Sequence, residues 1–429
     1  MTYGDRPVES NSRSLVMEDE FEGLEEYEII DTDDLEVEIE MSSTSEEEEE
    51  LNEYESDTEF ERKMSCIPTT DHASLIFSKH TGSVYCIGLH PQDENIVITG
   101  GQDEKPYIWN TQTGEVLMES DKFSDSVLNV AFNHDGKYVA AIDMGGKIQV
   151  WKTLPTGFNE VWDTKIDDVQ WMRWHPQANV LLVGESSGSV YMWKIPSGEC
   201  KVLPGHRDLA DVGAFMPDGK RAVICYIDGS IRVFNLANGN VCMKYDSPDI
   251  QLETVISLDV HPDNNLIAVG TISSRLYLLK TQGVKSAQQF MCVEEHEKGS
   301  EAVTTSVEYV VFSRKLPYNV IVAATDNALH VYDYVKSEER GYIPIEEGVT
   351  RLVWPEGKHI VYVGTKVGKI AVCDIRALKR IGTLEGHSKS ILDLAITKDA
   401  KTLFTTSDDH TVRLFPVDEL MSQFGNSTE

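Results

Sequence analysis

The sequence has few of the features that mark membrane, secreted or metal-binding proteins. No apolar run approaches the roughly 20 residues that a membrane-spanning helix needs, and the first residues lack the basic start and apolar core of a signal peptide. The seven cysteines are scattered and include no Cys-x-x-Cys pair, which argues against a zinc site and indicates a reducing compartment. We therefore expect no membrane insertion, no metal or cofactor, and a cytoplasmic location, with the nucleus as the alternative.

Positive charge is also scarce. The chain has 38 Lys and Arg against 72 Asp and Glu, a net charge of −34. It shows no cluster of cations of the kind that binds phosphates, so we expect no direct contact with nucleic acid. Residues 1–63 alone hold 25 Asp and Glu against 4 Lys and Arg, or −21, which leaves −13 on the rest. Because such a segment buries too little apolar surface to offset its ordering entropy, we predict a disordered acidic tail over residues 1–70.

This tail has two interpretations: an anionic arm that captures a strongly basic protein, or a tail that only maintains solubility. Within it, LEVEIEM at residues 35–41 alternates apolar and acidic residues, a pattern that either adds as a strand to a partner's sheet or arises by chance. Hydroxyl residues beside acidic ones predict phosphorylation by acidophilic kinases. They are Ser42, Ser43, Thr44, Ser45, Ser56 and Thr58.

The rest of the chain shows an internal repeat. One aromatic or apolar residue recurs with gaps of 42, 42, 41, 45, 53, 41 and 42 residues, at Trp109, Trp151, Trp193, Phe234, Leu279, Tyr332, Cys373 and Phe415. A period of about 40–45 residues, with a turn shortly before each mark, indicates the four-stranded blades of a β-propeller. The short apolar runs between turns such as HDG and SSG are expected strands. We therefore predict an all-β fold, an eight-bladed propeller.

The repeat also predicts boundaries. The ring should fold as one domain over residues 71–418, because each blade buries its faces only against its neighbours, and a short disordered tail should occupy 419–429. The longest gap contains a polar segment around Gln282 to Ser306, which we interpret as an enlarged loop in the sixth unit. The last unit stops after its third strand. We assign the missing strand to Ala73–Phe77, which would close the ring by pairing with the last blade.

Three units carry a histidine and an aspartate at a nearly constant spacing of 23, 22 and 22 residues. With the aromatic residue that follows, these sets are His80, Asp103 and Trp109; His206, Asp228 and Phe234; and His387, Asp409 and Phe415. The pattern resembles the WD-repeat proteins. We expect a structural role, in which a buried histidine donates to a buried carboxylate and ties a loop to a turn.

The other units depart from this pattern. Asp326 occupies the aspartate position of unit six without an evident histidine partner. Units two, three, five and seven have Gly145, Ser187, Ser273 and Val367 there, so we expect packing to hold these blades together.

One string matches a catalytic pattern. GESSG at residues 184–188 fits G-x-S-x-G, in which a serine nucleophile stands on a strand-to-helix elbow. Here the string falls in a turn between two expected strands, and no phosphate-binding loop or dinucleotide fingerprint is present. We therefore predict a binding module and not an enzyme.

A closer resemblance lies in WMRWHP at residues 171–176, PDGKRAVICYIDGSIRVFNL at 217–236, and TKDAKTLFTTSDDHTVRLF near the end. Together with the acidic start, these resemble the family of the angio-associated migratory cell protein, which includes a fungal propeller that escorts a large-subunit ribosomal protein. The resemblance implies one of two functions. The first is an escort chaperone for a newly made ribosomal protein; the alternative is a cytoplasmic signalling scaffold in cell migration and angiogenesis-type pathways.

We expect the binding site on the face where the histidine and aspartate loops emerge. The positions near the start of the innermost strands are Cys86, Asn129, Trp171, Val212, Ser257, Tyr309, Arg351 and Asp393. Those just before the turn aspartate are Gln102, Met144, Ser186, Ile227, Ile272, Thr325, Lys366 and Asp408. Neighbouring loops add Asp125, Asp167, Asp168, Asp208, Asp211, Glu346 and Glu347.

A face with many carboxylates and two aromatic rings, Trp171 and Tyr309, suits a short peptide rich in Arg and Lys. The alternative is that these carboxylates belong to solvated loops and bind nothing. Trp171 favours function because Val169, Met172 and Trp174 already supply that strand's core positions. Arg351 and Lys366 interrupt the acidic pattern, and either repel a basic ligand or pair with Glu346 and Glu347. The primary hypothesis is a monomer that binds a basic protein, such as the N-terminal segment of a ribosomal protein.

Overall fold

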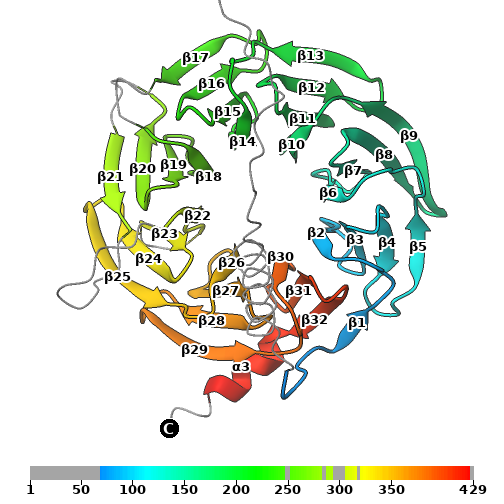
Figure 1. Cartoon of the computed structure of the whole chain (residues 1–429), viewed down its shortest axis with the longest axis vertical. Helices are drawn as coiled ribbons and strands as arrows, with labels where there is room; N and C mark the ends of the chain where they lie inside the picture. The colour runs from blue at the N-terminus through cyan, green and yellow to red at the C-terminus, as the bar shows by residue number, and fades with distance from the viewer. Residues whose placement is uncertain (1–67, 247–251, 283–286, 293–304, 316–318, 426–429) are drawn as a thin grey trace, which may run out of the picture. The chain divides into compact units, whose positions relative to one another are not determined.

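The computed structural model describes residues 68–246, 252–282, 287–292, 305–315 and 319–425. In this part of the chain, eight four-stranded antiparallel sheets stand side by side in a ring (Figure 1). The predicted eight-bladed propeller is confirmed. The tail predicted over residues 1–70, with its alternating segment and its phosphorylation sites, lies outside the described residues except for its last three positions.

Seven blades are built from consecutive strands, with the first strand of each innermost. Blades 1 and 2 are β2 (Val84–Leu89), β3 (Ile96–Gly101), β4 (Tyr107–Asn110), β5 (Val116–Glu119), β6 (Val127–Phe132), β7 (Tyr138–Asp143), β8 (Lys147–Leu154) and β9 (Gly157–Lys165). Blades 3 and 4 are β10 (Val169–Trp174), β11 (Val180–Glu185), β12 (Val190–Lys194), β13 (Glu199–Leu203), β14 (Ala210–Phe215), β15 (Arg221–Tyr226), β16 (Ile231–Asn235) and β17 (Val241–Tyr245).

The second half of the ring repeats this order. Blades 5 and 6 are β18 (Val255–Val260), β19 (Leu266–Thr271), β20 (Arg275–Lys280), β21 (Ala287–Met291), β22 (Val307–Phe312), β23 (Val320–Thr325), β24 (Ala328–Asp333) and β25 (Glu338–Pro344). Blade 7 is β26 (Val349–Val353), β27 (Ile360–Thr365), β28 (Ile370–Asp374) and β29 (Lys379–Leu384). Blade 8 consists of β30 (Ile391–Ile396), β31 (Thr402–Ser407), β32 (Val412–Pro416) and, from the start of the ring, β1 (Leu75–Phe77).

The ring closes through β1, as predicted. This strand pairs antiparallel with β32, with Leu75 opposite Leu414 and Phe77 opposite Val412. The ring of Phe77 is 2% exposed and stacks on Trp109 of blade 1, with centroids 4.3 Å apart and planes at 6°. This short strand therefore helps to join the last blade to the first.

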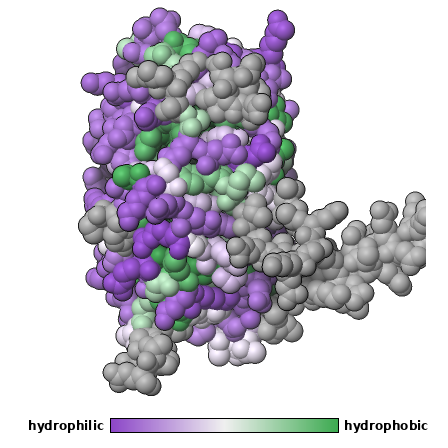
Figure 2. Space-filling view, turned by 90° about the vertical axis from the view of Figure 1, so that its left-hand side faces the viewer, coloured by the Kyte–Doolittle hydropathy of each residue, from purple (hydrophilic) through white to green (hydrophobic). Residues whose placement is uncertain are grey.

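Burial follows position in the blade. Second strands such as β11 and β15 are buried along nearly their whole length, because the neighbouring strands and blades enclose them on all sides, which explains their continuous apolar runs. Outer strands such as β13 are mostly exposed, and Figure 2 shows a largely hydrophilic rim on the side of blades 5 and 6, with separate apolar patches. The eight aromatic or apolar residues that recur along the sequence, from Trp109 to Phe415, are all buried and lie on the third strands of the blades.

Every innermost strand contains a β-bulge after its first residue. A bulge inserts one residue and re-aims the side chains around it. The bulge residues are half-buried or exposed in all eight blades: Tyr85, Leu128, Gln170, Asp211, Ile256, Glu308, Thr350 and Leu392. The next residue, in contrast, is buried in three blades: Cys86, Trp171 and Ser257.

Two boundary predictions need correction. Residues 417–425 form helix α3 (Val417–Gly425) and not a disordered tail, because Val417, Leu420 and Met421 lie at helical spacing and pack against blades 7 and 8. The polar segment Gln282–Ser306 is not wholly a loop, since β21 within it is the outer strand of blade 5. No helix among the described residues is long and apolar enough to cross a membrane.

Candidate functional site

One face of the ring, which we call the top face, carries two sets of loops. The inner loops lead into the innermost strands, and the turns connect the second and third strands. In seven blades the N–H of a turn residue donates to a carbonyl of the inner loop, at 2.8–3.2 Å: Gln102 to Ser83, Met144 to Ser126, Ser186 to Asp168, Ile227 to Leu209, Ile272 to Thr254, Lys366 to Gly348, and Asp408 to Ser390. This repeated bond holds the turn tips in fixed positions on the top face. It also places Ser186 in a strand-to-strand turn, so GESSG is not a nucleophile elbow.

The His–Asp pair of blade 1 is present as predicted. Nδ1 of His80 lies 2.9 Å from Asp103, and its Nε2 lies 2.9 Å from the hydroxyl of Thr99, which accepts a bond from Trp109 at 3.2 Å. Because the hydroxyl donates to Nε2, the proton of the ring lies on Nδ1 and is donated to the carboxylate. The network is buried and joins the inner loop, the turn and two strands.

Blade 8 repeats this network. His387 lies 2.9 Å from Asp409 and 2.6 Å from Thr405, while Phe415 at the tryptophan position has no donor. Burial lowers the pKa of His387, and its hydrogen bond to Asp409 lowers the pKa of that carboxyl although burial opposes this. Both networks stabilise the ring and leave no group free for a ligand.

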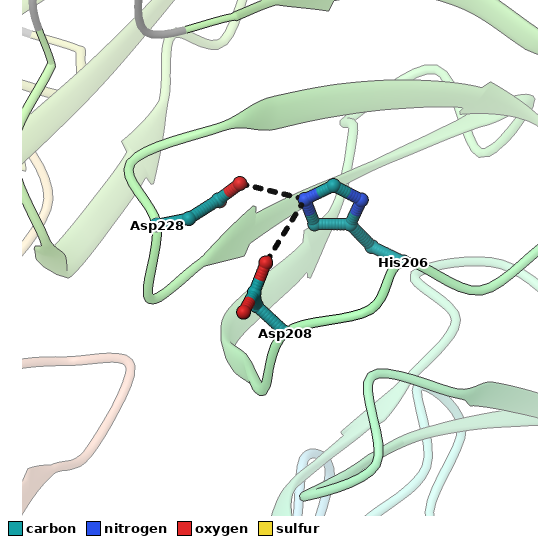
Figure 3. A group of neighbouring side chains, drawn as sticks. All are labelled: His206, Asp208 and Asp228. Atoms are coloured by element: carbon teal, nitrogen blue, oxygen red, sulfur yellow. Dashed lines mark hydrogen bonds and ion pairs between the residues drawn. The ribbon is translucent and has the colours of Figure 1, made fainter. Parts of the chain in front are cut away.

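Blade 4 differs from this prediction, because its histidine is turned around (Figure 3). Nε2 of His206, and not Nδ1, lies 2.7 Å from Asp228, while Nδ1 accepts a bond from Arg232 at 2.7 Å. The physical reason is Ile224, which stands where Thr99 and Thr405 stand in the other blades and offers no hydroxyl. The pair is also not buried, since the side chains of His206 and Asp228 are 19% and 37% exposed.

His206, Asp208 and Asp228 place three potential metal-ligand atoms within 4.8 Å of one another. Asp208 lies 3.5 Å from the same Nε2 (Figure 3). Because Nδ1 accepts a bond from Arg232, Nε2 is the nitrogen that donates to the carboxylates, and a metal ion at Nε2 would have to replace that hydrogen bond. We therefore assign the cluster to hydrogen bonding.

Blade 2, which has no turn aspartate, is held by more than packing, which corrects the expectation for that blade. In blade 2 the buried carboxylate of Asp143 accepts bonds from the N–H groups of Ser124 at 3.3 Å and Lys147 at 2.7 Å, and so ties the inner loop to the turn. At blade 5 the turn is tied to the next blade, because the hydroxyl of Ser274 and the backbone of Thr305, which leads into β22 of blade 6, exchange two hydrogen bonds at 2.5 and 2.8 Å. The loop-to-turn link is therefore kept within blade 2, whereas in blade 5 a polar link joins two neighbouring blades.

Trp171 is not on the solvent side of the top face, contrary to the prediction. It is 4% exposed and packs with residues of blade 4, and its indole N–H donates to the carbonyl of Ala210 at 2.9 Å. A Cβ added to Gly184 or Gly213 would lie 2.3 or 2.2 Å from the indole, so both glycines are needed to seat it. The prediction failed because both faces of this innermost strand are covered: Val169 and Met172 pack toward blade 2, and Trp171 packs on the opposite face toward blade 4.

Tyr309 and Asp393 are engaged within the chain. Arg351 places its guanidinium over the Tyr309 ring, 5.2 Å from the centroid, donates to the Tyr309 hydroxyl, and lies 3.4 Å from Asp393. Asp393 also accepts the N–H of Ile87 at 3.1 Å, and burial raises its pKa although Arg351 opposes this. The aromatic and acidic subsite expected for a ligand's arginine is therefore occupied by the chain's own arginine.

The remaining predicted carboxylates do lie on the top face. Asp167, Asp168 and Glu346 are exposed, and Asp125, Asp208, Asp211, Glu347 and Asp408 are half-buried. Four of them already have partners. Glu347 accepts two bonds from Arg380, both at 2.9 Å, and Asp408 accepts one from Ser83. Asp125 accepts the N–H of Ser126 at 2.7 Å, and Asp208 lies 3.5 Å from His206. The expected pairing of Arg351 and Lys366 with Glu346 and Glu347 is not formed.

Asp125, Asp167, Asp168 and Asp211 have no cationic partner within the described part of the chain. Asp211 is the bulge residue of β14, and burial raises its pKa. These free carboxylates belong to the inner loops and innermost strands of blades 2 to 4, whereas the top-face acids of blades 6 to 8 mostly have partners. The negative charge available to a ligand is therefore concentrated on one side of the top face.

A recess of about 630 Å³ lies on the other side, between blades 6, 7 and 8. Its walls include Glu308, Asp326 and Lys366, and Lys366 lies 2.6 Å from Asp326. We did not predict Glu308 as a site residue, although it is the exposed bulge residue of β22. The bulge that exposes it is visible only in the strand pairing, so the sequence offered no signal for it.

The comparison with known proteins agrees with this architecture. A family model described as "WD domain, G-beta repeat" matches residues 73–110, 117–152, 198–235 and 378–415. The angio-associated migratory cell protein of Homo sapiens is 33% identical over 352 residues, which are 81% of this chain and 80% of the relative. The chain belongs to the angio-associated migratory cell protein family.

A less similar relative is named for ribosome assembly. The ribosome assembly protein SQT1 of Saccharomyces cerevisiae is 24% identical over 389 residues, 82% of this chain and 88% of the relative. The crystal structure of Chaetomium thermophilum Sqt1 bound to the N-terminus of the ribosomal protein L10 has a TM-score of 0.71 and 20% identity, and covers 81% of this chain and 100% of that one. At this identity the likeness shows the fold alone.

Proposed function

We propose that the top face of this chain binds a basic segment of a ribosomal protein of the L10 type and shields it before assembly into the large subunit. The observation that carries the proposal is the group of unpaired carboxylates on blades 2 to 4, Asp125, Asp167, Asp168 and Asp211. The related Sqt1 structure, with the N-terminus of L10 bound, supports the choice of client.

The sector of blades 6 to 8 is a weaker candidate for the same ligand. Arg351 holds Tyr309 and Asp393, and Lys366 holds Asp326, so a client cation would have to displace an internal one. On blades 2 to 4 it would meet carboxylates that have no cationic partner in the described part of the chain. Charge-assisted bonds to Arg are about twice as strong as neutral ones and are often bidentate, so these carboxylates favour Arg-containing segments.

Long-range attraction should speed the encounter. The net charge of −34 creates a field that attracts a cationic client from a distance, and this effect weakens when salt shortens the screening length to below about 8 Å. We therefore expect affinity to fall steeply with ionic strength.

The test compares two charge-reversal variants of the full chain. Asp125→Lys/Asp167→Lys/Asp168→Lys alters the top face, and Glu199→Lys/Asp263→Lys/Glu338→Lys makes the same change of net charge at exposed positions away from it. The probe is a synthetic peptide of the L10 N-terminus, with affinity measured by titration calorimetry at low and high salt.

We expect the top-face variant to bind at least tenfold more weakly than the control variant, since each lost charge-assisted bond is worth roughly 1.5–3 kcal/mol. Equal weakening in both variants would show that net charge alone drives binding, and would refute the assignment of the site. Wild-type protein that does not bind the peptide would exclude this client and favour the scaffold alternative.

A further inference from the structure

Apolar side chains stand exposed at three of the turn tips on the top face. Met144 of blade 2, Ile227 of blade 4 and Ile272 of blade 5 are 50%, 45% and 50% exposed. The equivalent turns of blades 1, 7 and 8 carry the polar residues Gln102, Lys366 and Asp408. Turns of this kind favour polar residues, and packing within the ring does not require side chains that remain half in solvent.

Two of the turns that carry these side chains are linked to each other. The hydroxyl of Thr254 donates to the carbonyl of Ile227 at 2.8 Å, and the carbonyl of Thr254 accepts the N–H of Ile272 at 3.2 Å. One residue therefore bridges the turns of blades 4 and 5. Ile227 and Ile272, which we call the apolar pair, therefore stand on linked turns of neighbouring blades, and the half-buried Val212 and Ile256 lie on the adjoining innermost strands β14 and β18.

Carboxylates flank this apolar pair. Asp228 directly follows Ile227 and is half exposed to solvent beside His206 and Asp208. Asp211, without a cationic partner in the described structure, precedes Val212. A ligand that lies across blades 4 and 5 would therefore meet apolar surface and negative charge within a few residues of each other.

We infer that the client segment carries bulky apolar side chains between its basic residues, and that Ile227 and Ile272 contact them. The inference rests on the proposed function, and adds a requirement that charge alone does not impose. A purely basic segment would leave the two isoleucines in water, whereas Leu or Phe beside Arg would bury them while the guanidinium groups reach Asp211 and Asp228. The occupant is thus a mixed apolar and basic polypeptide segment.

The test uses two synthetic peptides of equal length and charge, one alternating Arg with Leu or Phe and the other alternating Arg with Ser. Affinities are measured for the full wild-type chain and for Ile227→Ser/Ile272→Ser. Serine retains the backbone hydrogen bonds of both turns, so this variant should fold. Val202→Ser/Val335→Ser is the matched control, because these valines are 53% and 65% exposed on an outer strand and on a turn between third and fourth strands.

We expect the wild type to prefer the apolar-containing peptide by about tenfold, as burial of two half-exposed side chains allows. Ile227→Ser/Ile272→Ser should lose this preference, bind the Arg–Ser peptide unchanged and keep the same salt dependence. The control variant should behave as wild type.

Equal affinity of the wild type for both peptides would overturn this inference and leave the proposed function standing. A preference that persists in Ile227→Ser/Ile272→Ser would also overturn it, because the apolar contact would then lie elsewhere. Failure of both peptides to bind would overturn the inference and the proposed function together.

Discussion

Replacement of Trp171 separates a role in the core from a role in binding. The indole is enclosed between Gly184 and Gly213 and donates to Ala210. We expect Trp171→Ala to lower the free energy of unfolding by about 3–5 kcal/mol, the usual cost when a buried aromatic residue is truncated and a cavity remains. Trp171→Phe should cost less, about 1–3 kcal/mol, since it removes mainly the donor to a buried carbonyl.

The two glycines provide an independent measure of the same packing. A Cβ at residue 213 would lie 2.2 Å from the indole, so Gly213→Ala should destabilise the ring by roughly 1–3 kcal/mol through overpacking. In Trp171→Ala/Gly213→Ala the obstructing ring is absent, and the combined cost should be smaller than the sum of the single costs. Additive costs would show that the two residues do not touch.

Guanidinium unfolding followed by circular dichroism measures these differences. Trp354→Ala is a suitable control, because Trp354 is partly exposed and donates to Lys358 within a turn, and its loss should cost less than that of Trp171. An unchanged unfolding midpoint in Trp171→Ala, combined with lost binding of the L10 peptide, would refute the core role of Trp171. It would indicate that the indole contacts the ligand.

Two further predictions concern the whole ring. Phe77→Ser should lower the unfolding midpoint by removing the stacked contact with Trp109 that closes the ring, and an unchanged midpoint would contradict closure through β1. Burial lowers the pKa of His90, so the folded state favours the neutral ring and the unfolded chain takes up the proton first. Stability should therefore be lost as the pH falls below about 6.5. His90→Gln should weaken this pH dependence of unfolding, and an identical dependence in the variant would exclude His90 as its source.

The eight-fold repeat could be predicted because it depends on local periodicity. Aromatic or apolar residues such as Trp109 and Phe415 recur once per blade along the sequence, and each blade buries the same positions against its neighbours. The closing role of β1 could be predicted for the same reason, since the last unit lacks one strand. The structural role of His80 and His387 followed from their spacing to an aspartate.

The side-chain arrangement on the top face required the tertiary structure. The bulge in each innermost strand leaves no clear sequence signal, yet it moves Trp171 inward and Gln170 outward. The orientation of His206 depends on Ile224, which lies on another strand, and the pairing of Arg351 with Tyr309 joins blades 7 and 6. Sequence periodicity determined which strands exist and which positions they bury. Contacts between strands and blades decided which charged and apolar groups remain available to a partner, because those contacts join residues that no local pattern relates.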